Sequence, residues 1–260
     1  MEPTDAFKRA QDSGAQGLFE HVMEEGVAEL ARPATSLWWS GVAAGMAMTT
    51  SVTAQAVLEL YLPDQPWTHL VSSFGYSLGF LIVVLGHLQL FTENTITTVL
   101  PLLRRRDVHC LVATLRLWAI VLVANLVGAA LSAFLAHLGL FPADVLGAMV
   151  TVSHHGVDHS PLETFWLGIP AGFLVAAMVW TSREAAQRFW MVLALTWLIA
   201  AGGFTHVIAG TVEVFLVVFA EGPSQLSLLL TFTGPAFVGN VVGGTFLFAL
   251  LAYAQVRDEL

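Results

Sequence analysis

Long apolar stretches alternate with short polar ones along the chain, and this pattern predicts the membrane-spanning elements. About 20 consecutive apolar residues cross a bilayer as a helix, so each stretch predicts a span. The six stretches are Ala34–Leu58, His69–Leu103, Leu111–Leu140, Phe165–Ser182, Phe189–Ala220 and Gly222–Val256. The pattern therefore predicts an all-α polytopic membrane protein with six transmembrane helices.

The second and fifth stretches are too long for one ordinary helix. Straight helices over His69–Leu103 and Phe189–Ala220 would measure about 52 Å and about 48 Å, against an apolar bilayer core of about 30 Å. Each stretch has a polar or glycine-rich centre, at 86–94 and at 202–206. Non-helical backbone at membrane depth is tolerated where protein buries it or a cavity adjoins it. We therefore expect helices 2 and 5 to be broken. The alternative is a strongly tilted helix, or a helix plus an interfacial segment.

The two ends of the chain carry different patterns. Residues 1–33 are polar and acidic, and from about Gly17 apolar residues recur at near-helical spacing, which predicts a cytoplasmic N-terminal amphipathic segment. Residues 34–260 then form the six-span domain. Within its last stretch, Gly234-Pro235 predicts a surface lead-in followed by one helix.

The positive charges predict the orientation in the membrane. Every Lys and Arg except Arg116 lies before the first span, between spans 2 and 3, between spans 4 and 5, or after span 6. Cytoplasmic loops carry such an excess of positive charge. We therefore expect both termini to be cytoplasmic, in the cytoplasmic (inner) membrane of a bacterium. Arg116 lies near the cytoplasmic end of span 3, from which its side chain can reach the interface.

Composition narrows the function. Hydrophobic residues make up 56% of the chain and charged residues only 11%, whereas soluble domains have about 25% charged residues. The formal net charge of −9 leaves no basic surface for nucleic acid. No G-x-S-x-G or H-E-x-x-H motif is present, so we expect neither an enzyme nor a cofactor. The cluster of His154, His155, Asp158 and His159 is interpreted as a solvated outer loop without a metal.

The two halves of the chain resemble each other. Asn125-Leu-Val-Gly128 in span 3 recurs as Asn240-Val-Val-Gly243 in span 6, and the break at Phe91-Thr92 maps with nearly the same offset onto Thr205-His206. The repeats cover about 34–140 and 160–256. Each contains three spans, an odd number, so the copies are inverted in the membrane. Such repeats place a binding site near the midplane at their interface.

Glycines spaced four residues apart predict close helix packing within these repeats. The pairs are Gly41/Gly45, Gly75/Gly79, Gly168/Gly172 and Gly239/Gly243.

His206 is the first candidate for chemistry, because it lies at the second break. Ionisable groups at membrane depth usually face the bundle interior or a water-filled path, and histidine exchanges a proton near neutral pH. The alternative is a neutral histidine that is hydrogen-bonded in the core. Thr92, at the first break, is placed to hydrogen-bond His206 across the repeat axis.

Further polar residues adjoin the two breaks. Thr92 or Asn94 is expected to cap the helix after the first break. Glu93 then lies in the first turn of that helix, where its negative charge interacts favourably with the positive end of the helix dipole. We also expect Glu93 to pair with a neighbour. Glu213 lies seven residues after His206 on the same helical face. Its role in a path, at a subunit contact or in a structural pair stays open.

The chain resembles the formate/nitrite transporter family over nearly its whole length after residue 30, and three motifs carry the resemblance. They are Leu90-Phe91-Thr92, the turn at 203–206, and the glycine-rich segment at 239–244. Residues 89–95 and 243–246 are most similar to the YfdC-like branch of that family. The resemblance implies an aquaporin-like fold, a homo-pentamer in the lipid bilayer with a pore in each protomer, and passage of small monovalent anions such as formate, nitrite or hydrosulfide.

The resemblance also implies roles for particular residues. His206 corresponds to the central pore histidine. Asn125 and Asn240, which begin the repeated motif, are interpreted as supporting residues. Further side chains of the path and its constriction correspond to Tyr76, Phe80, Leu90, Phe91, Thr92, Ile199 and Thr205. The chain departs from the family pattern where a vestibule lysine is replaced by Gly156, two asparagines by Gly172 and Gly210, and an acid before the histidine by Thr205.

The sequence therefore predicts a transporter or channel for small monovalent anions or their neutral acids. We expect the path to be proton-linked through His206, because a bare anion crosses apolar rings only at high cost. Two alternatives stay open: a pore for a small neutral solute, and a membrane sensor or interaction protein without transport.

Overall fold

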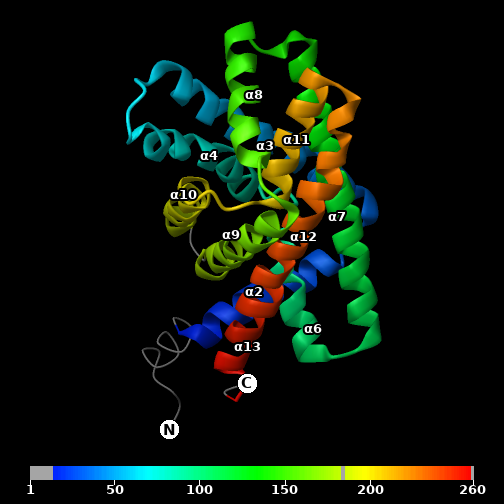
Figure 1. Cartoon of the computed structure of the whole chain (residues 1–260). Coiled ribbons are helices and arrows are strands. Elements are labelled where there is room, and N and C mark those ends of the chain that lie inside the picture. The colour runs from blue at the N-terminus through cyan, green and yellow to red at the C-terminus, as the bar shows by residue number, and fades with distance from the viewer. Residues whose placement is uncertain (1–13, 183–184, 259–260) are drawn as a thin grey trace.

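The computed structural model describes residues 14–182 and 185–258, and every regular element within them is helical (Figure 1). Residues 1–13 of the expected N-terminal segment lie outside the described residues. The first half contains α2 (Ala15–Leu30), α3 (Ala34–Tyr61), α4 (Thr68–Leu85), α5 (Asn94–Thr97), α6 (Val99–Arg105), α7 (Val108–Leu135) with a wider π-helical turn to Leu140, and α8 (Ala143–Val157). The second half contains α9 (Pro161–Thr181), α10 (Ala185–Ala201), α11 (Val207–Glu221), a 3-10 turn (Pro223–Ser227), α12 (Gly234–Val241) and α13 (Leu250–Val256), with wider turns at Leu229–Thr233 and Val242–Ala249.

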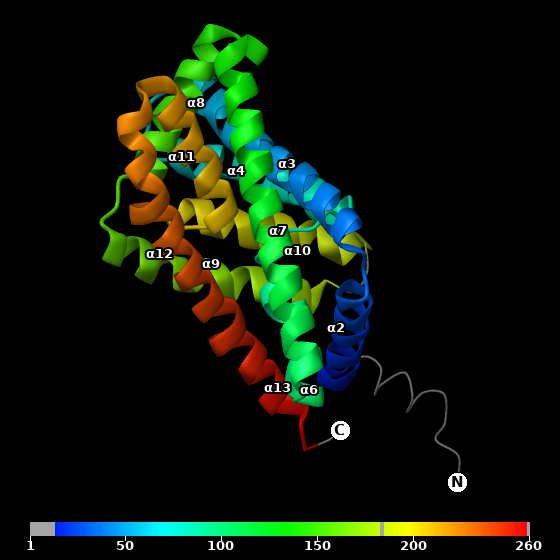
Figure 2. The same cartoon turned by 90° about the vertical axis from the view of Figure 1, so that its right-hand side faces the viewer.

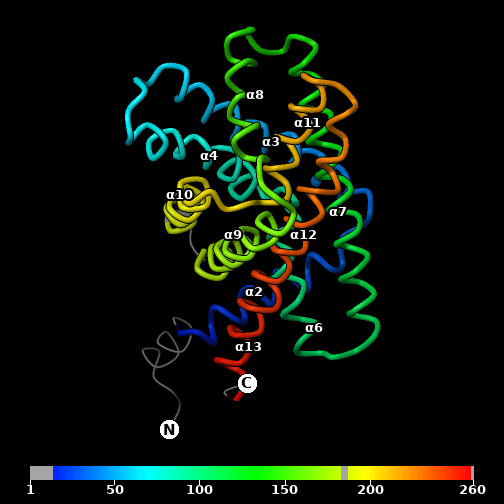
Figure 3. The backbone as a smooth tube through the Cα atoms, viewed as in Figure 1, coloured from blue at the N-terminus to red at the C-terminus, as the bar shows by residue number. Residues whose placement is uncertain are grey.

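Six apolar crossings account for most of these elements, as predicted. Five described helical stretches are long and apolar enough to cross a membrane: Ala34–Tyr61, Thr68–Leu85, Val108–Leu140, Pro161–Thr181 and Pro223–Val256. The remaining crossing consists of α10 and α11 in series. Both predicted breaks are present, at 86–93 between α4 and α5 and at 202–206 between α10 and α11. Figure 3 shows the backbone leaving α10 as a non-helical segment before α11 begins.

Two of the predicted element boundaries are wrong. The expected outer loop around His154 and His155 contains α8, which packs on α3 and α11. The lead-in predicted at Gly234-Pro235 is also wrong, because helical turns continue through this pair from residue 223 onwards. Pro235 follows the wider turn at Leu229–Thr233 and stands at the start of α12.

The helices form two inverted three-helix repeats. In the first repeat α3 packs on α4 and α7; in the second repeat α9 packs on α10 and α12. The repeats meet where α4 contacts α10 and where α11 contacts α3 and α7. Figure 2 shows α7 and the α12–α13 rod converging toward the bottom of the view, with α9 and α10 crossing behind them.

Glycines allow the closest helix contacts in both repeats, as their spacing predicts. A Cβ on Gly45 of α3 would overlap the carbonyl oxygen of Asn125 in α7. A Cβ on Gly172 of α9 would overlap the carbonyl oxygen of Asn240 in α12. The two asparagines are therefore held directly against the first helix of their own repeat.

The amphipathic helix predicted from about Gly17 is α2, and it packs on the bundle. Phe19 and Val22 are fully buried in a cluster with residues of α5, α6 and α13. Glu29 of α2 accepts a hydrogen bond from Nε2 of Gln89 in the first break at 2.8 Å. The helix therefore contacts the first break directly.

Candidate functional site

Asn125 and Asn240 hold the two breaks in the same way. The side-chain oxygen of Asn125 accepts from the amide of Phe91 at 2.9 Å, and its Nδ2 donates to the carbonyls of Gly41 and Gln89, both at 2.8 Å. The side chain is fully buried. One side-chain amide thus satisfies two backbone groups that the broken helix leaves unpaired, and its third hydrogen bond ties the break to α3.

In the second repeat, the side-chain oxygen of Asn240 accepts from the amide of Val207 at 2.9 Å. Its Nδ2 donates to the carbonyls of Gly168 and Thr205, both at 2.9 Å. These contacts correct the correspondence expected from sequence. Phe91 corresponds to Val207 rather than to Thr205, and Leu90 corresponds to His206, a shift of two residues.

His206 lies at the end of the second break, where it caps α11. Its side chain accepts a hydrogen bond from the amide of Ala209 at Nδ1, at 3.2 Å. Nε2 lies 2.8 Å from the hydroxyl oxygen of Thr92, which is the contact predicted across the repeat axis. Both side chains are buried, His206 at 1% exposure and Thr92 at 0%.

The two contacts of His206 assign its hydrogen. A neutral imidazole has one donor nitrogen and one acceptor nitrogen. Because Nδ1 accepts from the backbone, Nε2 carries the hydrogen and donates to Thr92. The hydroxyl hydrogen of Thr92 has no acceptor among the described residues, so it is free to bond a solute that reaches this point.

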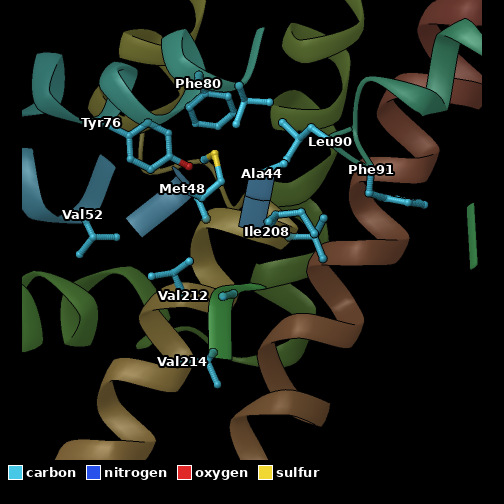
Figure 4. Packing of buried hydrophobic residues seen from close by; sticks show 14 of the residues in the cluster. Ala44, Met48, Val52, Tyr76, Phe80, Leu90, Phe91, Ile208, Val212 and Val214 are labelled. Carbon is cyan, nitrogen blue, oxygen red and sulfur yellow. The ribbon is translucent and has the colours of Figure 1, made fainter. Parts of the chain in front are cut away.

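Aromatic and apolar side chains surround the histidine. The ring of Phe80 meets the imidazole edge-on, with 5.0 Å between centroids, and Tyr76 lies 5.3 Å from Phe80. Figure 4 shows Tyr76 and Phe80 extending from α4, with Leu90 in the first break beside them. Phe80 and Leu90 are fully buried and Tyr76 is 6% exposed. Together with His206 they form a collar, which we define as Tyr76, Phe80, Leu90 and His206.

Other expected path residues lie outside the collar. Phe91 turns away from the collar (Figure 4) and packs against Trp118 and Phe237, at 5.5 Å and 5.2 Å between ring centroids. Ile199 is fully buried. Thr205 donates its hydroxyl to the carbonyl of Thr164 at 2.7 Å.

A cavity of about 200 Å³ reaches the collar from the side of α8. We call it the outer cavity. His206, Tyr76 and Thr205 line its inner part, and Glu213 also lines it. Sequence reasoning missed Gln55, Glu59 and His69, which line the same cavity. It also missed the position of His155 and His159, because the helix that carries His155 was interpreted as a loop.

A second cavity, of about 240 Å³, lies on the side of α2, and we call it the inner cavity. Its polar residues include Glu25, Glu29, Gln89, Glu93 and Arg188. The predicted pairing of Glu93 is not found: its Oε1 is buried with no hydrogen-bond partner in the described ranges. The predicted cap is also not found. No side chain caps α5, and Asn94 instead donates to the carbonyl of Leu90 at 3.2 Å.

The remaining expected charges lie apart from the collar. Arg116 is exposed on α7. His154 pairs with Glu221 at 2.6 Å. Neither residue lines the outer or the inner cavity.

Comparison with known proteins gives consistent matches. A sequence model described as formate/nitrite transporter matches residues 16–254. The chain is 35% identical to the inner membrane protein YfdC of Escherichia coli over 250 residues, which cover 95% of this chain and 81% of that protein. It is 27% identical to the formate channel FocA of Haemophilus influenzae over 182 residues, which cover 65% of this chain and 62% of that protein.

Two solved structures show the same fold. A structure titled FNT family ion channel superposes with a TM-score of 0.79 at 19% identity, covering 92% of this chain and 98% of that one. A structure titled pentameric formate channel with formate bound superposes with a TM-score of 0.71 at 20% identity, covering 86% and 98%. The predicted fold class, an aquaporin-like bundle of six spans with helices 2 and 5 broken, is confirmed.

Proposed function

Because the chain belongs to the formate/nitrite transporter family, we propose that it is a multi-pass inner membrane protein that carries small monovalent anions or their neutral acids. Formate, nitrite and hydrosulfide represent this class. The supporting observation is the buried hydrogen bond between His206 and Thr92. It joins the two broken helices at the inner end of the outer cavity.

The proposed path runs from the outer cavity through the collar to the inner cavity. The collar is buried, and its polar groups are the imidazole of His206, the hydroxyl of Tyr76 and the neighbouring Thr92 hydroxyl. An anion without water or a counter-charge is costly there, whereas a small neutral acid is not. A solute at the collar can accept a hydrogen bond from the hydroxyl of Thr92. Nε2 of His206 orients this hydroxyl by donating to its oxygen.

Proton linkage through His206 has a structural consequence. The neutral ring uses Nδ1 to cap α11, so a second proton binds there only if the bond from the Ala209 amide opens. Protonation is thereby coupled to the first turn of α11. This coupling supports our proposal that His206 links proton and solute movement rather than serving only as a fixed donor.

We propose that the protein is a homo-pentamer, like the pentameric formate channel with a similar fold. The apolar side chains that α4 exposes suit contacts with lipid or with neighbouring subunits. They are Leu70, Phe74, Leu78 and Ile82. The excess of positive charge outside the spans supports a cytoplasmic location for both termini and for the N-terminal segment at 1–33, which precedes the transporter domain at 34–260. The family consists of transporters and channels, so we propose no enzymatic activity.

The experiment that tests this proposal compares His206→Asn with His206→Phe in proteoliposomes. Asparagine keeps an acceptor that caps α11 but does not titrate, whereas phenylalanine removes both properties. We expect the parent protein to take up formate faster as the pH falls. Both variants should lose the contribution of His206 to that pH dependence, and only His206→Phe should also lose the cap, about 1 kcal/mol of stability.

The proposal would be contradicted if His206→Asn kept the full pH dependence of the parent. Flux that is electrically silent and independent of pH in the parent would favour the pore for a neutral solute. Absence of flux for formate, nitrite and hydrosulfide would favour the sensor.

A further inference from the structure

The outer cavity contains a carboxylate that the proposed path does not explain. Glu213 of α11 is 8% exposed and lines the cavity. Its carboxylate accepts no hydrogen bond from any described residue, although a buried carboxylate normally has such partners. A buried acid without a partner, next to an empty cavity, indicates a ligand that donates a hydrogen bond or carries positive charge.

The surroundings of Glu213 contain no compensating charge. Its helix packs on α3, α7, α8 and the segment before α12. The titratable side chains that line the cavity beside it are Glu59, His69, Tyr76, His155, His159 and His206. Lys and Arg are absent from the described lining. Glu59 accepts from Ser72 at 3.0 Å and from Gln55 at 3.3 Å. The cavity therefore has two carboxylates facing neutral or weakly basic groups, which is unfavourable for an anion.

A glycine on the neighbouring helix fixes the position of the carboxylate. A Cβ on Gly156 of α8 would overlap Oε2 of Glu213. The carboxylate therefore occupies the space that any side chain at position 156 would need. Gly156 and Glu213 thus act as a pair that holds an acid group against the wall of the cavity.

We propose that Glu213 makes the outer cavity a site for the undissociated form of a small acid and turns away the anion of that acid. The proposal rests on the proposed function. The hydroxyl of an undissociated acid donates to the free carboxylate of Glu213. The anion of the same acid is repelled by that carboxylate within the cavity. The acid then enters the collar already neutral.

A small cation is the competing ligand. It fits the two carboxylates equally well, but the cavity ends at the apolar collar, through which a cation passes only at high cost. In the described ranges no three acidic, histidine or cysteine side chains converge as a metal site. These observations favour the neutral acid.

The test measures uptake of labelled formate and the accompanying current in proteoliposomes between pH 5 and 8. The parent protein should take up formate without net current. Its uptake should fall about tenfold per pH unit, because the fraction of formic acid falls by that factor. Glu213→Gln should take up less formate at pH 5, because its neutral amide is a weaker acceptor than the carboxylate, and it should still pass no current, because the apolar collar is unchanged. Glu221→Gln is the matched control, because Glu221 ends the same helix, pairs with His154 and lies outside the cavity.

An infrared difference spectrum on addition of formate at pH 5 provides a second readout that does not require transport. The carboxyl band of Glu213 should shift in the parent and in Glu221→Gln, and this shift should be missing in Glu213→Gln. Size-exclusion chromatography checks that each variant keeps the assembly of the parent.

Several results would overturn the inference. The first is current at neutral pH in the parent, and the second is parent-like uptake and pH slope in Glu213→Gln. The third is competition by methylammonium that Glu213→Gln abolishes, which would identify a cation site. If the parent and both variants take up no formate, but the parent still shows the infrared shift, the result contradicts only the proposed transport function. Loss of both would contradict both proposals.

Discussion

The two breaks share one backbone design but differ in the side chain at its centre. Two residues after α4, His87 lies in the left-handed region at φ 51°, and two residues after α10, Gly203 does so at φ 63°. The next amide, of Leu88 or of Phe204, then donates back into the preceding helix at 2.9 Å in both breaks. An asparagine from the last span of each repeat then fixes the extended segment. Because both repeats share this backbone geometry, the break belongs to the architecture of the repeat and does not depend on the side chain at its centre.

The difference lies at Leu90 and His206, which occupy equivalent positions. His206 caps its helix, so α11 runs without interruption from Val207. Leu90 has no side-chain acceptor, and the chain after it makes tight turns before the short helix that begins at Asn94. A single residue thus gives one half of the collar a polar, titratable group and the other half an apolar wall. We infer that the function depends on this asymmetry rather than on the repeat.

The largest expected effects come from removing the shared support. Asn125→Ala and Asn240→Ala each lose three hydrogen bonds to buried backbone groups. An unsatisfied buried group costs about 1–3 kcal/mol. We therefore expect each variant to lose roughly 3 kcal/mol or more of stability. Thermal unfolding in detergent measures the loss.

Because the two breaks have the same support, Asn125→Ala and Asn240→Ala should lose similar amounts of stability. Gln225→Ala, which removes one exposed hydrogen bond to Glu221, should change stability by less than about 0.5 kcal/mol. A large loss in only one of the two asparagine variants would show that the breaks are supported differently.

The sequence alone predicts much of this arrangement. Apolar runs that exceed the bilayer thickness predict both broken helices, and repetition of the Asn-x-x-Gly motif predicts the inverted repeats. The same reasoning places His206 next to Thr92. These features are predictable because the membrane imposes length and polarity limits that one sequence already reveals.

Other features depend on three-dimensional contacts. The correspondence between the two breaks that the sequence predicts differs by two residues from the one in the structure. Leu90 and His206 share no chemistry, so only the contacts of the two asparagines reveal that they are equivalent. The direction of Phe91 depends on Trp118 and Phe237, which are distant in sequence. Glu59 stands one residue beyond the predicted first span, and no local pattern connects it to Glu213.

A moderate effect is expected from the glycines that hold the asparagine helices close. Gly45→Ala and Gly172→Ala each place a Cβ on backbone atoms of α7 or α12, and such overpacking typically costs about 1–3 kcal/mol. Gly147→Ala in α8 is the control, since no heavy atom lies within 4 Å of the added Cβ. It should be neutral or slightly stabilising in thermal unfolding. A neutral result for Gly45→Ala and Gly172→Ala would disprove the close contact.

The smallest effects test whether the left-handed residues are equivalent. A left-handed conformation costs a non-glycine residue about 1–2 kcal/mol, and a new glycine returns part of this through the entropy of the unfolded chain. His87→Gly should therefore stabilise the protein by about 1 kcal/mol or less, and Gly203→Ala should destabilise it by a similar amount, since nothing lies within 4 Å of its added Cβ. His87→Ala separates the two contributions at position 87: it removes the imidazole but keeps the strain, so the difference between His87→Ala and His87→Gly reports the backbone alone. If His87→Gly unfolds at a lower temperature than His87→Ala, the left-handed geometry of the first break is not a strained copy of the second.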